Sequence, residues 1–196
     1  MKLRLLALIA PGLAGPLSAG GPSVVISEVH YHSPAETAAG DPLEFIELSS
    51  LAGEPSSLAG WTLEGGIEFS FPAQAVIEPH GYLVVARDAG RIEADHGITG
   101  VLGSFTGRLP NGRGRISLRD RDGALVDRVA YRDEDPWPEN PDGLGPSLEK
   151  TDLLQDGENQ ASWRASILPG GTPGQRNSTD RRLSSRTLIS PGAVWR

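Results

Sequence analysis

Glycine and proline interrupt this chain so often that few long helices can survive in it. The 196 residues include 25 Gly and 16 Pro, while hydrophobic residues make up 38%. Both residue types disfavour the interior of a helix, whereas short strands joined by turns accommodate them at the turns. The chain is long enough to bury a core as one domain. The spacing of the breakers therefore predicts an all-β fold, with a sandwich favoured over an α/β fold.

Short segments rich in β-branched, aromatic and alternating apolar residues recur between the breakers, and they predict about seven to nine strands in a mostly antiparallel sandwich. The segment 43–49 carries Phe45 on one parity and Ile46 and Leu48 on the other, which indicates a strand covered on both faces. The expected strand segments are 23–31, 43–49, 58–63, 67–71, 75–77, 82–87, 114–118, 125–131 and 147–150.

Two local signals add a hairpin and a helix. Asp122-Gly123 lies between two apolar runs, which predicts a hairpin over 114–131. Asp88 is a suitable N-cap for a short helix over 89–94, and Gly97 is a suitable stop. Six residues from the strand segments are expected to be mostly buried, namely Val25, Phe45, Trp61, Val84, Leu118 and Val129.

The N-terminus has the pattern of a secretory signal peptide over residues 1–19. Lys2 and Arg4 precede an apolar run over 5–17, and Leu17-Ser18-Ala19 supplies a small-residue cleavage site. The alternative is an uncleaved anchor, but the run is short for a spanning helix. We therefore expect a secreted or extracytoplasmic protein associated with the cell envelope, without a stable membrane span after cleavage. Cleavage would change the net charge from −7 to −9, because it removes two basic residues and no acid.

The charge and the cysteine count restrict the partners. An acidic chain repels phosphate backbones, and its arginines are scattered along the sequence, so nucleic acid is not an expected partner. Cysteine is absent, so the chain forms no disulfides and has no thiol nucleophile. A Gly-x-Ser-x-Gly motif is also missing.

Several short sequence segments, in their order along the chain, resemble the lamin tail domain family. The segments are VVISEVHYH at 24–32, EFIEL at 44–48, LAGWTL at 58–63, FPAQAVIEPHGYLVVARD at 71–88 and GRISLRDRDGALVDRVAY at 114–131, followed by SLEK, SWR and GGTPGQRN. The resemblance covers 23–177 and implies an immunoglobulin-like β-sandwich, of the exported bacterial type, with an accessory role. Residues 178–196 are then expected to be a linker and the start of a further domain that this chain lacks.

Glu28, His30 and His32 alternate along the first expected strand and are the strongest metal-binding candidate. His-x-His with a carboxylate on the same strand face can bind Zn²⁺, which gives the alternative hypothesis of a metal-dependent hydrolase. The competing interpretation is a polar strand end, because Pro34 follows directly.

Other acidic residues have plainer interpretations. Glu44 and Glu47 would lie on opposite strand faces, which excludes a paired glycosidase site, and Glu47 is expected to accept backbone N–H groups. Asp127 shares parity with Val129, so we expect it to be buried and hydrogen-bonded. Asp120 and Asp122 are hairpin residues, whereas the acidic loop 133–135 is either solvated or a weak Ca²⁺ site.

The sequence thus predicts a protein that is not an enzyme, with no catalytic, cofactor-binding or metal-binding residues and no cofactor. Its expected function is adhesion, scaffolding or anchoring at the cell envelope, through an unidentified protein or polysaccharide.

Overall fold

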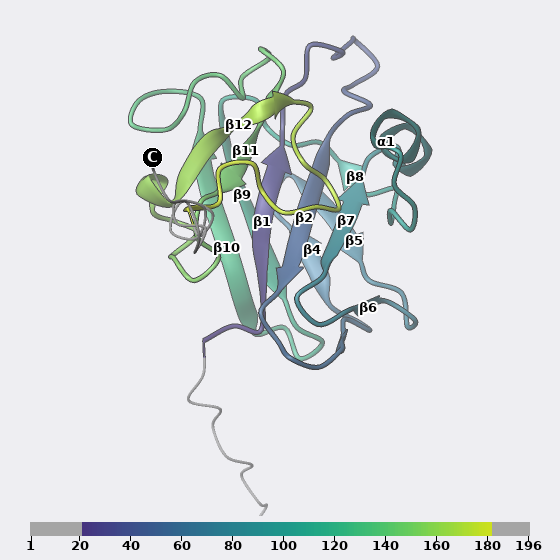
Figure 1. Ribbon diagram of the computed structural model, residues 1–196. Helices are drawn as coiled ribbons and strands as arrows, with labels where there is room; N and C mark the ends of the chain where they lie inside the picture. The colour runs from purple at the N-terminus through teal and green to yellow at the C-terminus, as the bar shows by residue number, and fades with distance from the viewer. Residues whose placement is uncertain (1–20, 182–196) are drawn as a thin grey trace, which may run out of the picture.

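The computed structural model describes residues 21–181 as a β-sandwich of two five-stranded sheets (Figure 1). The first sheet has the order β12-β11-β1-β2-β7, and the second has the order β10-β9-β4-β5-β8. All pairings between these strands are antiparallel, and β3 and β6 form a separate antiparallel pair. The predicted all-β, immunoglobulin-like sandwich is confirmed.

The described residues form twelve strands rather than the seven to nine expected, and three of the twelve are only two residues long. The elements are β1 Val24–His30, β2 Phe45–Ser50, β3 Ser56–Ser57, β4 Thr62–Glu64, β5 Ile67–Ser70, β6 Val76–Ile77, β7 Tyr82–Ala86, α1 Ala89–His96, β8 Thr106–Gly107, β9 Arg113–Arg119, β10 Leu125–Arg132, β11 Pro146–Lys150, the 3₁₀ turn η1 Gln160–Ser162 and β12 Trp163–Pro169.

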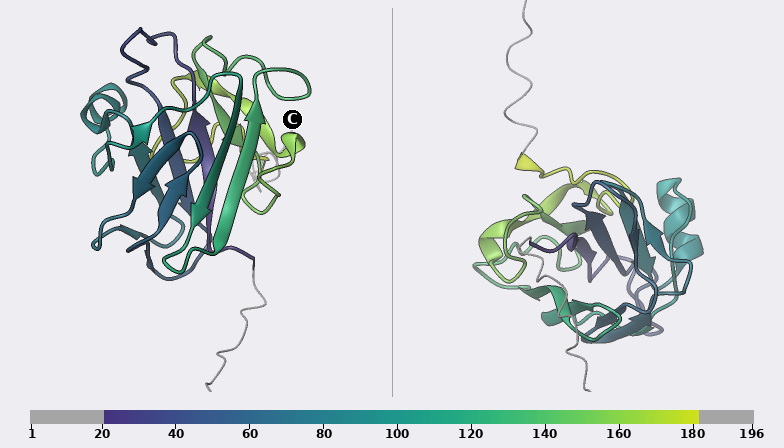
Figure 2. Two further views of the ribbon diagram at one scale, coloured as in Figure 1. Left: turned by 180° about the vertical axis from the view of Figure 1, so that it is seen from behind. Right: turned by 90° about the horizontal axis from the view of Figure 1, so that it is seen from below.

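The main core fills the space between the two sheets, whose layers are seen edge-on in Figure 2. Both sheets send alternate apolar side chains into it, and most of these are fully buried. Tyr31 and Tyr131 stack across this core with their ring centroids 4.4 Å apart. Of the six predicted core residues, five are buried, whereas Trp61 is only partly buried and packs against the edge of the core.

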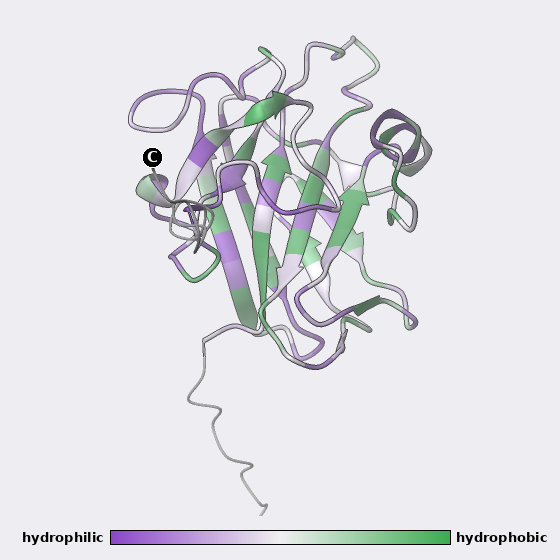
Figure 3. Cartoon of the chain, viewed as in Figure 1, coloured by the Kyte–Doolittle hydropathy of each residue, from purple (hydrophilic) through white to green (hydrophobic). Residues whose placement is uncertain are grey.

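The first sheet is covered on both faces. All six residues of β2 are buried. Ile46 and Leu48 belong to the main core, while Phe45 belongs to a second cluster that includes Ile92 of α1. The prediction of a strand with two covered faces is therefore confirmed. Figure 3 shows hydrophobic and hydrophilic residues side by side along β1 and β2, so polar residues are buried in this sheet beside the apolar ones.

The helix and the hairpin form where they are predicted. The side chain of Asp88 accepts a hydrogen bond from the Arg91 N–H, which caps α1 at its start, and Gly97 ends the helix in the left-handed conformation. β9 and β10 form a hairpin, with Gly123 in its turn at φ 80°. Among residues 21–181, no helix is long and apolar enough to span a membrane. The predicted signal peptide, 1–19, lies outside the described residues.

Candidate functional site beneath a C-terminal strap

Three glutamates lie side by side across the middle of the first sheet. Glu28 of β1 is paired in register with Glu149 of β11 on one side and with Glu47 of β2 on the other. All three residues have 0% of their surface exposed. We call these three residues the glutamate row. Three adjacent buried carboxyl groups are unfavourable unless hydrogen bonds or protons compensate them.

A bulge in β1 turns the glutamate row away from the main core. Ile26 and Val29 both belong to the main core, although they are an odd number of residues apart. The register between β1 and β2 shifts between Ile26 and Glu28, which inserts one extra residue and changes the parity of the strand. Glu28 and His30 therefore face outward.

The segment 170–181, which we call the strap, crosses the outward face of the first sheet. Figure 1 shows it as the yellow trace in front of β1 and β2. Its backbone supplies one N–H donor to each member of the glutamate row. Thr172 N donates to Glu28 Oε1 at 2.8 Å, Gly174 N donates to Glu47 Oε2 at 2.7 Å, and Thr179 N donates to Glu149 Oε2 at 2.9 Å.

Hydroxyl groups complete the solvation of the glutamate row. Ser147 Oγ donates to Glu28 Oε1 at 2.5 Å, and Ser27 Oγ donates to Glu47 Oε1 at 2.6 Å. Thr172 Oγ1 lies 2.8 Å and Ser178 Oγ lies 3.0 Å from Glu149 Oε1. Among the described residues, no Lys, Arg or His forms an ion pair with the row. The carboxyl groups are thus held by neutral donors.

Burial changes the protonation of the glutamate row. It raises the pKa of Glu28 to about 8, with the nearby Glu149 adding to the rise and the Ser147 hydroxyl opposing it. Burial and the neighbouring Glu28 also raise the pKa of Glu47 well above its ordinary value. At neutral pH the row therefore retains at least one proton. It has no exposed surface through which to reach a substrate, so its visible role is to bind the strap.

The strap also binds the sheet through Asn177. Its Nδ2 donates to the carbonyl oxygens of Ser27 and Lys150, both at 2.9 Å. Ser178 and Thr179 lie in the segment predicted to be a linker, yet both contact Glu149. The linker prediction for 182–196 lies outside the described residues.

The three residues of the predicted metal set do not converge. Glu28 lies under the strap, while His30 is buried beside Phe45, with Nδ1 3.1 Å from the Leu43 carbonyl oxygen. Burial lowers the pKa of His30 to about 4. His32 lies beyond the end of β1, and its ring nitrogens contact Asp142 at 2.6 Å and Glu36 at 3.0 Å.

The part of the chain from 21 to 181 contains no group of three or more His, Cys, Asp or Glu side chains placed to hold a metal ion. The metal-dependent hydrolase alternative therefore gains no support from the geometry.

Glu44 and Glu47 do lie on opposite sides of the sheet. Glu44 Oε1 accepts from Leu109 N at 3.0 Å, and Glu44 Oε2 lies 3.1 Å from Arg87 Nη1. Burial raises the pKa of Glu44 to about 7, although Arg87 opposes this rise. Glu47 accepts a backbone N–H from the strap, so the prediction that it binds backbone donors is confirmed.

Asp127 links the two sheets. Its side chain is 11% exposed, and Oδ2 accepts from Ile26 N of β1 at 2.8 Å. Lys150 of β11, which is 1% exposed, places Nζ 3.6 Å from the same oxygen. Burial lowers the pKa of Lys150, and Asp127 opposes this change. The predicted burial and hydrogen bonding of Asp127 are confirmed, but the cation is a lysine that sequence reasoning did not identify.

The remaining acids have local roles. Asp120 Oδ1 accepts from the backbone N–H groups of Asp122 and Ala124, as expected of hairpin residues. In the acidic loop, Glu134 contacts Arg113 at 2.6 Å. Calcium binding by the loop 133–135 stays a prediction.

Comparison with known families gives one match. A family model described as the Lamin Tail Domain matches residues 18–133, which is more than half of the chain. The matched range includes Glu28 and Glu47, whereas Glu149 and the strap follow it. No curated protein matches the chain.

Proposed function

Since the chain belongs to the lamin tail domain family, whose members are immunoglobulin-like and non-enzymatic modules, we propose that it is an exported attachment module of the cell envelope. In this role it performs no chemistry. It anchors itself, or a protein joined to it, to a protein or polysaccharide of the envelope. The proposal includes the extracytoplasmic location that the segment 1–19 suggests, and the bacterial type that the family resemblance implies.

The observation that best supports this proposal is that all three carboxyl groups of the glutamate row bind the strap. Two of its carboxyl groups, Glu28 and Glu47, have strongly raised pKa values, and acids with perturbed pKa values often mark catalytic sites. Here the strap covers them and supplies their donors. The chain's unusual chemistry therefore stabilises the fold, and recognition is left to the exposed sheet face and loops.

The experiment is cell fractionation. The full chain with a C-terminal tag is expressed in a bacterial host beside a variant lacking residues 1–19. The full chain should appear in the envelope or extracellular fraction with Gly20 as its first residue, and the truncated variant should stay in the cytoplasm. Cytoplasmic retention of both forms would refute export.

Attachment is tested separately by cosedimentation of the exported protein with washed envelope fragments. Binding that saturates supports the proposal, and its absence refutes it. The metal-dependent hydrolase remains the alternative. It predicts about one zinc per chain in purified protein, lost on Glu28→Gln.

A further inference from the structure

The β9–β10 hairpin brings five arginines of the segment 113–132 onto one face. They lie on the outward face of β9 and β10, opposite the alternate residues Ile116, Leu118 and Val129, which are fully buried in the core. Register places Arg113 beside Arg132, Arg115 beside Ala130 and Arg128 beside Ser117. We call this surface the arginine face, and its cations are Arg113, Arg115, Arg119, Arg128 and Arg132.

The acids near the arginine face compensate it only partly. Glu134 contacts both Arg113 and Arg132, at 2.6 and 3.9 Å, and Glu158 contacts Arg128. Among the ion pairs of the described residues, none involves Arg115. The Nε of Arg128 is buried without a hydrogen-bond partner in the described structure. That buried Nε cannot reach a surface ligand, but the exposed Arg115 keeps guanidinium donors that no ion pair uses, although the whole chain has a net charge of −7.

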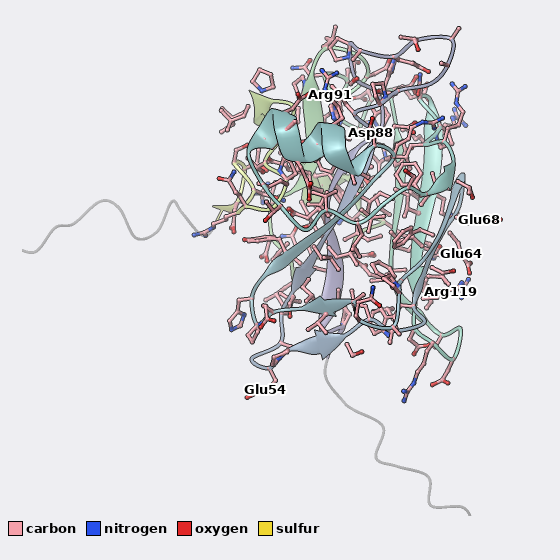
Figure 4. The ribbon with its side chains drawn as sticks, turned by 90° about the vertical axis from the view of Figure 1, so that its right-hand side faces the viewer. Glu54, Glu64, Glu68, Asp88, Arg91 and Arg119 are labelled. Atoms are coloured by element: carbon pink, nitrogen blue, oxygen red, sulfur yellow. The ribbon has the colours of Figure 1, made fainter. Side chains whose placement is uncertain are left out.

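Two glutamates border the arginine face on the same sheet. Arg119 lies 2.9 Å from Glu64 of β4, and Glu68 of β5 is paired with Glu64 across the neighbouring strands. Figure 4 shows Arg119, Glu64 and Glu68 along one side of the molecule. An extended anion is therefore directed along β9 and β10, which span about 20 Å, rather than across the sheet.

We propose that the arginine face binds a linear polysaccharide that carries carboxylate groups. A planar guanidinium donates two parallel hydrogen bonds to a carboxylate. Successive outward residues of a strand lie about 6.6–6.8 Å apart, so the two strands present a double row of such donors. The exposed pairs with Glu134 and Glu158 can exchange for ligand carboxylates, because surface ion pairs are weak and screened.

The surface favours a polysaccharide over single-stranded nucleic acid. Proteins that bind single strands combine basic residues with aromatic side chains on which bases stack. No outward residue of β9 or β10 between Arg113 and Arg132 is aromatic, and Tyr131 points into the core. The inference rests on the proposed envelope function, for which it names the ligand class.

The test measures binding of polygalacturonate to the full chain by isothermal titration calorimetry, with dextran as the neutral polymer. The double variant Arg115→Ser/Arg132→Ser should bind about tenfold more weakly. The matched control Arg91→Ser/Arg108→Ser removes two exposed arginines from other parts of the surface and should bind like the unmodified chain. Arg115→Lys/Arg132→Lys should lose less affinity than the serine pair, because it keeps the charge.

Several results would overturn the inference. They are no binding of polygalacturonate, equal binding of dextran, equal losses in the two serine pairs, or tighter binding of a single-stranded oligonucleotide. Envelope cosedimentation separates this failure from that of the proposed function. If the Arg115→Ser/Arg132→Ser variant still sediments fully with envelope fragments, attachment stands and the arginine face is not its site.

Discussion

Asp127 shows how a single buried carboxylate can join the two sheets. It accepts the Ile26 N–H of β1 and faces Lys150 of β11, although it belongs to β10 of the other sheet. Asp127→Ala leaves the N–H unpaired and the buried lysine without a counter-charge. We expect a loss of about 1–3 kcal/mol in the free energy of unfolding, measured by urea denaturation.

Two further variants separate the hydrogen bond from the charge. Asp127→Asn keeps an acceptor for Ile26 and should cost less than Asp127→Ala. Asp127→Ala combined with Lys150→Met should cost less than the sum of the two single variants, because it removes both charges together. Strict additivity would show that the pair does not interact.

Parity along the strands predicted the burial of Asp127 but not its partner, because Lys150 comes from a strand of the opposite sheet. Parity has a second limit at bulges. β10 shifts register between Leu125 and Asp127, and Leu125 is consequently 46% exposed even though it shares parity with the buried Val129. Bulges depend on local pairing, which spacing alone does not reveal.

At the scale of elements, the strap is the segment whose position the sequence did not predict. The sequence segments that contain the strap and the glutamate row were recognised as similar to the family. Their spacing did not indicate that the strap contacts the glutamate row. A substitution at Gly171 tests the contact between the strap and the glutamate row. The φ of Gly171 is 81°, and an added Cβ would lie 1.9 Å from Glu28 Oε1 and 2.6 Å from Ser147 Oγ. A side chain at this position must therefore push the strap away from the sheet.

Gly123 is the matched control for Gly171. It has nearly the same φ, 80°, but an added Cβ would meet nothing within 4 Å. Gly123→Ala should cost only the backbone strain of about 1–2 kcal/mol. Gly171→Ala should cost a further ~1–3 kcal/mol through overpacking, and it should speed proteolytic cleavage within the strap. Equal losses of stability in urea would mean that the strap contributes little to the fold.

At the scale of the molecule, the sequence predicted the sandwich, the helix and the hairpin because these depend on local pattern. The arginine face depends on which strands become neighbours. Arg113 and Arg132 lie at the two ends of the predicted hairpin, and its register brings them side by side. Charge counted along a sequence is therefore a poor guide to charge on a sheet, where alternate residues of paired strands collect on one side.

The glutamate row should make the stability of the whole molecule fall as the pH rises above neutral. Glu28 has a pKa of about 8 in the folded protein and an ordinary value of 4.5, and the pKa of Glu47 is raised in the same direction. Their stabilising contribution is complete below about pH 4.5 and is lost as the pH rises through the folded value. Between pH 6.5 and 8.5 unfolding then releases protons from these carboxyls, which lowers stability by up to about 1.4 kcal/mol per pH unit for each.

The window of pH 6.5 to 8.5 isolates the glutamates from His30, whose lowered pKa acts mainly below pH 6.5 and with the opposite sign. Urea denaturation across this window should therefore show a falling free energy of unfolding for the unmodified chain. Glu28→Gln/Glu47→Gln keeps the size and an acceptor oxygen of each side chain but removes both of these titrations. Its profile should therefore fall much less steeply, and the remaining slope should come mainly from Glu44, whose pKa is raised to about 7. Glu64→Gln/Glu68→Gln changes two exposed glutamates and should leave the slope intact. A flat profile in the unmodified chain, or the same slope after the Glu28 and Glu47 substitutions, would place the titrating groups elsewhere.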